Sequence, residues 1–360
     1  MPKNTDHSPS NLSVLQGKNK AIKQIIALLA ACFLVWLSFR GAHLSEVLKY
    51  AAQANPVFLG LMCLSALLSH LIRSWRWLIL MRPLKANISL WHSFCAVMYG
   101  YAVNIVVPRG GEIVRLITIS KMESLPWAGV LPTLLIDRLL DLVTIAILIG
   151  FTLIALPASM FKSMPWLYPS GITITVSSLA LLLILPKLSP LLSIILSVPN
   201  IKRLIPTAVS KKINDLLAQF AEGTKCLTNP LTYPIIALSS IAIWLCYWLN
   251  FYFVLLAFSL DKTLTLSKGL MLFTVSSLGS LVPTPGCVGG FHLLVSKCLV
   301  LIFGINQDLA LAFATVLHAF AFVITICTAA FCCFLCQQFL ERKANKLTLP
   351  AEQKSVEDLQ

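Results

Sequence analysis

The sequence predicts an all-α polytopic membrane protein with about six to eight transmembrane helices, arranged as two inverted repeats that each contain a re-entrant hairpin. The first observation behind this class is composition: 58% of the 360 residues are hydrophobic, 12% are charged, and the mean hydropathy is +0.84. Soluble domains are about a quarter charged. The other two observations are a series of long apolar stretches and the interruption of two of them by Pro and Gly. Composition also excludes a disordered chain and a secreted disulfide scaffold.

Six apolar stretches are long enough to cross a bilayer, which needs about 20 residues per helix. They cover residues 22–39, 57–80, 126–156, 169–187, 232–258 and 309–336. The first stretch follows several lysines and resembles a signal peptide, but it lacks a small-residue cleavage pattern and many further spans follow. We therefore interpret it as an uncleaved first transmembrane helix.

Two further apolar stretches, 90–120 and 269–304, are broken in the middle. Pro and Gly at such density end a helix, so each stretch predicts a helix–break–helix hairpin. The residues of the breaks are Pro108, Gly110 and Gly111 in the first, and Pro283, Pro285, Gly286, Gly289 and Gly290 in the second. Broken segments at corresponding places in two halves of a chain are typical of transporter repeats.

Positive charges orient the chain, because Lys and Arg collect in cytoplasmic loops. With a cytoplasmic N-terminus and two re-entrant hairpins, the inside segments hold 19 Lys and Arg and the outside segments hold 5. Both termini are then cytoplasmic, and the hairpins enter from opposite faces. If both arms of the second hairpin cross the bilayer, eight spans result and the termini stay inside.

The predicted organisation has five parts. They are a disordered cytoplasmic tail (1–20), a first membrane repeat (21–186), a basic cytoplasmic linker (187–230), a second membrane repeat (231–336) and a cytoplasmic tail (337–360). Within the linker, Ile213, Leu216, Leu217 and Phe220 fall at helical spacing, which favours an amphipathic helix at an anionic membrane surface. A plain connection between the repeats is the alternative interpretation.

Charged residues inside apolar stretches are costly in a bilayer, and they are therefore the first candidates for function. Arg73 lies in the stretch 57–80 with His70 on the same face. We interpret Arg73 as a residue that binds a lipid headgroup or a phosphate. Arg76 is one turn closer to Arg82 and the cytoplasmic interface. For Arg76 we favour a side chain that snorkels to that interface.

The first break carries the sharpest local motif. Gly110 and Gly111 let the backbone turn, and the helix that follows points its free N–H groups at the break, where Arg109 adds a cation. Such a helix start is an anion site. Glu112 suits the helix start electrostatically, and Arg115 follows at i+3. A capped cytoplasmic turn with an ordinary Glu112–Arg115 ion pair is the alternative.

Two carboxylates share one face of the stretch 126–156, because Asp137 and Asp141 are four residues apart. In a bilayer they require cations or protons, and Arg138 or arginines of other elements are available to neutralise them. The pattern fits either a buried structural network or a proton relay and counter-charge for a moving headgroup. In the second half, His292 is a candidate titratable group or a packed histidine.

The order of these motifs resembles a known family. Pro108-x-x-Gly111-Glu112-x-x-Arg115, Asp137-Arg138-x-x-Asp141 and Pro283-x-Pro285-Gly286 resemble the membrane portion of lysylphosphatidylglycerol synthases, which recurs as a stand-alone family of flippase-like membrane proteins. The resemblance covers residues 20–336. Where the family usually shows Gly and then Glu in the second break, this sequence has Cys287 and His292.

The resemblance implies lipid translocation. The aminoacyl-transferring domain of the full synthases is soluble and C-terminal, and this sequence ends about 24 residues after its last expected span. We therefore expect a flippase-like translocator in the bacterial inner membrane. Its expected substrate-binding residues are Arg73, Arg109, Glu112, Arg115, Asp137, Arg138, Asp141 and His292.

The expected partners are membrane lipids that are anionic, aminoacylated or polyprenyl-linked. We expect no nucleic acid, cofactor or metal, and the sequence leaves oligomerisation open. One alternative is an integral membrane transferase acting on a lipid-linked sugar or an aminoacyl lipid, with Asp137 or Glu112 as base. A third is an accessory subunit of an envelope-lipid enzyme. The sequence has no P-loop, D-x-D, G-x-S-x-G or H-E-x-x-H motif, which favours the translocator.

Overall fold

The computed structural model describes residues 28–30, 32–155, 165, 167–198, 206–280 and 284–348. Within these ranges the chain forms helices and no strand, so the predicted all-α class is confirmed. The expectations for the tail 1–20, for Pro283 and for the last residues of the tail 337–360 lie outside the described residues.

The long helices coincide with the apolar stretches. They are α3 (Pro56–Met81), α6 (Trp127–Ala155), α8 (Leu167–Ser197), α11 (Tyr233–Ala257) and α14 (Gln307–Thr348). Five stretches of the described residues are long and apolar enough to cross a membrane, and α6 is not one of them. They are Pro56–Met81, Pro169–Ser197, Pro230–Ala257, Pro285–Phe303 and Gln307–Leu335. A sixth span is counted if the helix Leu28–Phe39 and α2 (Leu44–Gln53), bent by 85°, make one span. The protein is therefore polytopic, at the lower end of the predicted number of spans.

Both predicted hairpins are present. The first consists of α4 (Leu90–Val106) and α5 (Gly111–Glu123), and the second of α12 (Leu266–Gly279) and α13 (Gly290–Phe303) with the short 3-10 turn η3 (Pro285–Cys287) in its break. Their arms have 17, 13, 14 and 14 residues. Each of these helices alone is shorter than the roughly 20 residues that a bilayer requires. Together, however, η3 and α13 (Pro285–Phe303, 19 residues) are long and apolar enough to be a candidate span.

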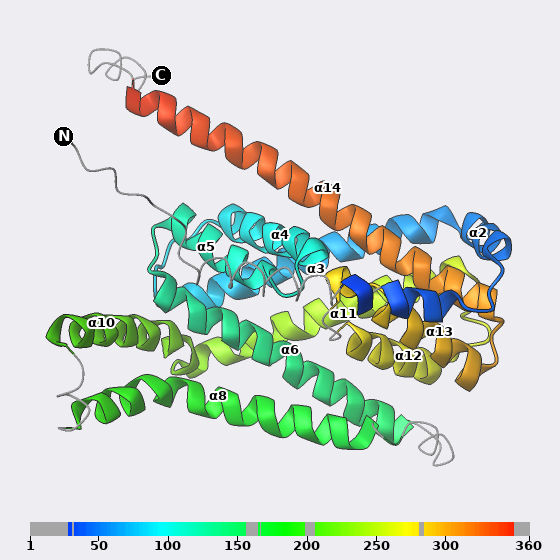
Figure 1. Ribbon diagram of the computed structural model, residues 1–360, viewed down its shortest axis with the longest axis horizontal. Helices are drawn as coiled ribbons and strands as arrows, with labels where there is room; N and C mark the ends of the chain where they lie inside the picture. Colours follow the sequence, from blue (N-terminus) through cyan, green and yellow to red (C-terminus); the bar gives the residue numbers. More distant parts are fainter. Residues whose placement is uncertain are drawn as a thin grey trace, which may run out of the picture.

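The two hairpins enter the fold from opposite ends. In Figure 1 the first hairpin lies at the end that also holds α10 (Thr207–Thr224), and the second lies near α2 at the other end. The element order α3, hairpin, α6 recurs as α11, hairpin, α14, and α3 packs along α11. Because α4 also contacts η3, the first hairpin reaches the break of the second inside the fold. This order and the opposed hairpins are consistent with the inverted repeat, which stays a prediction.

Close backbone contact builds the first hairpin. A Cβ atom on Gly111 would lie 1.9 Å from the carbonyl oxygen of Gly100, so α5 can approach α4 only with glycine at this position. The Gly111 N–H donates a hydrogen bond to Oδ1 of Asn104, 2.8 Å away, and this bond caps the start of α5 from α4.

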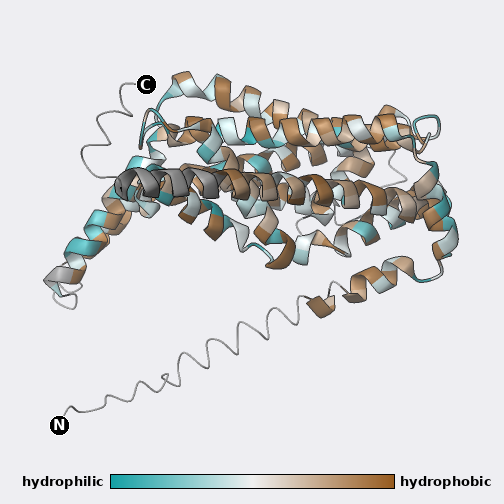
Figure 2. Ribbon diagram, turned by 90° about the horizontal axis from the view of Figure 1, so that it is seen from above, coloured by the Kyte–Doolittle hydropathy of each residue, from teal (hydrophilic) through white to brown (hydrophobic). Residues whose placement is uncertain are grey.

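The surface of the long helices is apolar. Figure 2 shows hydrophobic residues along the middle of the molecule and hydrophilic residues toward its ends. Large apolar side chains are exposed on several helices, as is normal where lipid is the solvent. Examples are Ile147, Val176, Leu183, Leu238, Ile241, Leu301, Val323 and Phe331.

The segment assigned to a linker contains two helical parts. α8 continues through Pro186 and Pro190 to Ser197, and α10 is the amphipathic helix expected from the spacing of its apolar residues. α10 packs on α6 and α8. A Cβ on Gly223 would lie 2.0 Å from the Gly129 carbonyl oxygen, so the end of α10 is seated directly on α6.

Candidate functional site

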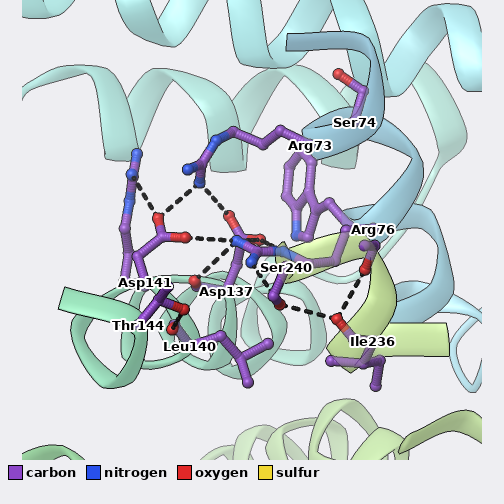
Figure 3. Close-up of polar contacts among 12 residues, drawn as sticks. Arg73, Ser74, Arg76, Asp137, Leu140, Asp141, Thr144, Ile236 and Ser240 are labelled. Carbon is purple, nitrogen blue, oxygen red and sulfur yellow. Dashed lines mark hydrogen bonds and ion pairs between the residues drawn. The ribbon is translucent and has the colours of Figure 1, made fainter. Parts of the chain in front are cut away.

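Two arginines of α3 and two aspartates of α6 form a buried ionic cluster inside the fold (Figure 3). Arg73 Nη1 lies 2.8 Å from Asp141 Oδ2 and 3.3 Å from Asp137 Oδ2. Arg76 donates from Nε to Asp137 Oδ1 at 2.9 Å and from Nη2 to Asp141 Oδ1 at 2.8 Å. Each guanidinium group therefore bridges both carboxylates, as its planar fork of donors allows.

A third arginine joins the cluster from the first hairpin. Arg115 of α5 donates from Nη1 to Asp137 Oδ2 at 3.0 Å, and its guanidinium carbon lies 3.9 Å from the centre of the Trp77 ring. The residue is 2% exposed. Its Nε and Nη2 atoms are buried and have no hydrogen-bond partner among the described residues. Arg115 therefore keeps two donors for a further acceptor.

The second repeat contributes hydroxyl groups from α11. Ser240 Oγ accepts a hydrogen bond from Arg76 Nη1 at 3.0 Å. Tyr247 OH accepts from Nε and Nη2 of Arg73, at 3.3 and 3.2 Å. The arginines of α3 thus link α6 of the first repeat to α11 of the second, and the cluster lies between the repeats.

An ion pair between α5 and α6 lies at the more exposed edge of the cluster. Arg138 Nη2 contacts Glu112 Oε1, and the two side chains are 34% and 30% exposed. Arg138 Nη1 also lies 3.7 Å from Asp141 Oδ2. Glu112 pairs here with Arg138 of the neighbouring helix, and its intrahelical pairing with Arg115, the alternative considered above, is not found.

The described ion pairs leave one positive charge in excess, because four arginines (Arg73, Arg76, Arg115 and Arg138) face three carboxylates (Glu112, Asp137 and Asp141). A buried charge without a counter-charge is strongly unfavourable in a low-dielectric interior. The cluster can therefore accept one additional anionic group.

The structure brings together six of the predicted site residues. They are Arg73, Glu112, Arg115, Asp137, Arg138 and Asp141. Two others lie apart from the cluster. Arg109 is exposed in the first break, in a left-handed conformation (φ 59°), and His292 is buried in α13 of the second hairpin.

Sequence reasoning missed Arg76, Ser240 and Tyr247. Arg76 is 0% exposed, so its expected snorkelling to the interface is wrong: α6 and α11 cover its end of α3. The spacing of the charged residues along the two helices could have predicted the cluster. Arg73 and Arg76 share one face of a helix, as Asp137 and Asp141 do, and two such faces match each other in charge.

No metal centre is found in the part of the chain that the structure describes, since no three His, Cys, Asp or Glu side chains there are grouped to hold an ion. The charged groups of the cluster are guanidinium and carboxylate groups, and the guanidinium groups suit binding of an anion through charge-assisted hydrogen bonds.

These features define a polytopic helical membrane protein with two broken helical hairpins at opposite ends and a buried arginine–aspartate cluster. The family described as "Lysylphosphatidylglycerol synthase TM region" matches residues 24–329, and the chain belongs to this family. The matched region includes the whole cluster and both hairpins, so the resemblance seen in the motifs is confirmed.

Two relatives give the range of proteins with this sequence pattern. The UPF0104 membrane protein MJ1595 of Methanocaldococcus jannaschii is 27% identical over 139 residues, which cover 38% of this chain and 40% of that protein. Glycosyltransferase AglD of Haloferax volcanii is 23% identical over 307 residues, which cover 78% of this chain and 49% of that protein. The chain thus matches less than half the length of each relative. No solved structure matches the chain.

Proposed function

We propose that this protein translocates lipids with an anionic, phosphate-bearing headgroup across the bacterial inner membrane, with both of its termini in the cytoplasm. The observation that carries the proposal is the excess positive charge of the cluster, together with the two unpartnered donors of the buried Arg115. A phosphate oxygen is a fitting acceptor for these donors, because arginine forks bind phosphate through paired hydrogen bonds.

In this mechanism the headgroup moves through the polar region between the repeats while the acyl chains stay in lipid. The Glu112–Arg138 pair, about one third exposed, is the part of the cluster that an approaching headgroup meets first. Displacement of that pair would give the headgroup access to Arg115. Both residues of the pair lie near the first hairpin, so a small movement of α5 changes access to the cluster.

The aspartates act as counter-charges. Three guanidinium groups contact Asp137 and stabilise its charged form, which makes a proton relay through this carboxylate unfavourable. The same contacts make Asp137 a poor general base for a transferase. The family match supports the membrane-lipid setting, and the name of the AglD relative keeps the transferase as the competing function.

The test is lipid translocation by the purified protein in phosphatidylcholine vesicles containing a trace of fluorescent phosphatidylglycerol. Arg115→Gln removes the charge and the fork, and we expect the translocation rate to fall at least about tenfold, since one charge-assisted hydrogen bond is worth roughly 1.5–3 kcal/mol. The matched control is Arg82→Gln, which removes an exposed arginine at the end of α3. Wild-type rates in correctly folded Arg115→Gln protein would contradict the proposal.

A further inference from the structure

The break of the second hairpin ends at a helix start to which the described residues contribute no side-chain cap. α13 has 14 residues, its N-cap is Gly289 (φ 87°), and its first turn contains no acidic residue. The corresponding start of α5 is different, since Asn104 caps the Gly111 N–H and Glu112 stands in the first turn. The positive end of the α13 dipole therefore has no compensating side chain among the described residues.

A buried histidine lies at the same point. His292 is the third residue of α13 and is 7% exposed, and its Nδ1 atom has no partner among the described residues. Its ring packs edge-on against His318 of α14, with 4.8 Å between ring centres, and His318 Nε2 lies 3.0 Å from the Gly286 carbonyl oxygen. Since Gly286 belongs to η3, the contact through His318 places the His292 ring beside the break, as expected for a side chain that leans toward the N-terminus of its helix.

The first hairpin places a cation near this point. α4 contacts η3, so Arg109 of the first break and Cys287 of the second lie in neighbouring turns. Both residues have left-handed backbone conformations (φ 59° and φ 62°), so the two breaks hold these side chains in fixed, unusual turns. A helix N-terminus and an imidazole thus lie at the second break, next to the turn that carries Arg109.

We propose that the N-terminus of α13 and His292 form a second anion site that binds a phosphate group, either of a lipid headgroup or of free phosphate. The inference rests on the proposed function, because it gives the translocated headgroup a second binding position in the opposite half of the protein. The free N–H groups of a helix start bind tetrahedral oxyanions. The imidazole N–H adds one hydrogen bond.

The site is tested by isothermal titration calorimetry of the full chain in detergent. One arm uses inorganic phosphate and the other uses dihexanoyl phosphatidylglycerol. His292→Phe keeps a ring but removes the donor, and we expect binding about tenfold weaker. His292→Gln keeps an N–H donor and is expected to restore most of the affinity. Lys297→Gln is the matched control, because it removes a cation from the same helix outside the proposed site.

A further variant keeps the site testable if His292→Phe does not fold. His292→Glu places a carboxylate in the first turn of α13, where it suits the helix dipole as Glu112 does in α5. This variant is expected to fold and to lose anion binding, because its own carboxylate occupies the helix start. Binding in one arm only identifies the source of the phosphate group.

Two results would overturn the inference: absence of binding in both arms for the wild-type protein, or unchanged binding in folded His292→Phe and His292→Glu. Translocation by the wild-type protein is recorded separately, together with the effect of Arg115→Gln. If translocation depends on Arg115 while the His292 variants bind anions normally, the second site is wrong and the proposed function stands. If no translocation occurs but phosphate binds through His292, the proposed function fails and the site remains.

Discussion

Arg76 and Asp137 are held together by three contacts in the interior of the fold, where both residues are 0% exposed. The carboxylate oxygen Oδ1 lies 2.9 Å from Nε and 2.7 Å from Nη2, and Nη2 also donates to the Asp137 main-chain oxygen at 3.2 Å. This pair joins α3 to α6 at a depth where neither charge can reach water.

Asp137→Asn should destabilise the protein by about 3–5 kcal/mol, because it leaves buried arginines without their shared carboxylate. Arg73, Arg76 and Arg115 all contact this side chain. Thermal unfolding in detergent measures the loss. If the cluster also binds headgroups, the fraction of Asp137→Asn protein that folds and inserts should translocate lipid far more slowly. Normal translocation per folded molecule would show that the cluster is structural only.

Arg76→Lys should cost roughly 1–3 kcal/mol of folding free energy, although it conserves the charge. A lysine ammonium cannot reproduce the fork that contacts Asp137, Asp141 and Ser240 together. Chemical denaturation of the variant beside Arg82→Lys, an exposed position, measures the difference. Equal stability of the two variants would mean that Arg76 reaches the interface.

Gly111→Ala should destabilise the first hairpin by at least about 1–3 kcal/mol, because its Cβ would collide with the Gly100 carbonyl oxygen. Gly60→Ala in α3 is the control, since its Cβ would meet no atom within 4 Å, and alanine favours the helix. We expect the control to be neutral or slightly more stable in thermal unfolding. Similar unfolding temperatures for both variants would argue against the close α4–α5 contact.

Glu123 at the end of α5 predicts a dependence of stability on pH. Its carboxylate accepts hydrogen bonds from Lys85 Nζ at 2.5 Å and the Ser89 N–H at 3.0 Å, and it lies 2.6 Å from His92 Nδ1. Burial acts to raise the pKa of Glu123, but these hydrogen bonds outweigh burial and leave the pKa below its ordinary value. The charged carboxylate therefore links the end of α5 to the start of α4 at the base of the first hairpin.

A lowered pKa in the folded state means that this stabilisation is present above the unfolded pKa of about 4.3 and is lost as the pH falls through the folded pKa. Glu123→Gln should lower stability at neutral pH by roughly 1–3 kcal/mol. The stability curves of mutant and wild type should converge as the solution is acidified below about pH 4. Parallel curves from neutral to acidic pH would contradict the role of the charged carboxylate.

The sequence located the helices of the fold well, because long apolar runs and Pro–Gly breaks are local signals. The pairing of charges was harder to predict. Asp137 and Asp141 were found from their spacing, but the partner of Glu112 depends on how α5 packs against α6. Arg76 was misjudged for the same reason: its distance along the chain from Arg82 suggested an interface, while the tertiary fold buries it.

The second hairpin also shows which contacts cannot be predicted from local sequence. Glycine and proline in the sequence predict a break, but only packing brings His318, 26 residues after His292, against it. The contact between α4 and η3 is likewise a property of the assembled repeats. Local sequence therefore predicts where the chain turns, and long-range packing decides which side chains meet at the turns.

The central claim is that the buried cluster binds a phosphate-bearing headgroup through Arg115. The most direct measurement compares the translocation of fluorescent phosphatidylglycerol with that of a fluorescent glucosylceramide, which has no phosphate, in vesicles containing wild-type protein or Arg115→Gln. We expect the wild-type protein to move phosphatidylglycerol at least about tenfold faster than the glycolipid, and Arg115→Gln to abolish that preference, because the excess positive charge is then removed. Equal rates for both lipids, unaffected by Arg115→Gln, would contradict the account.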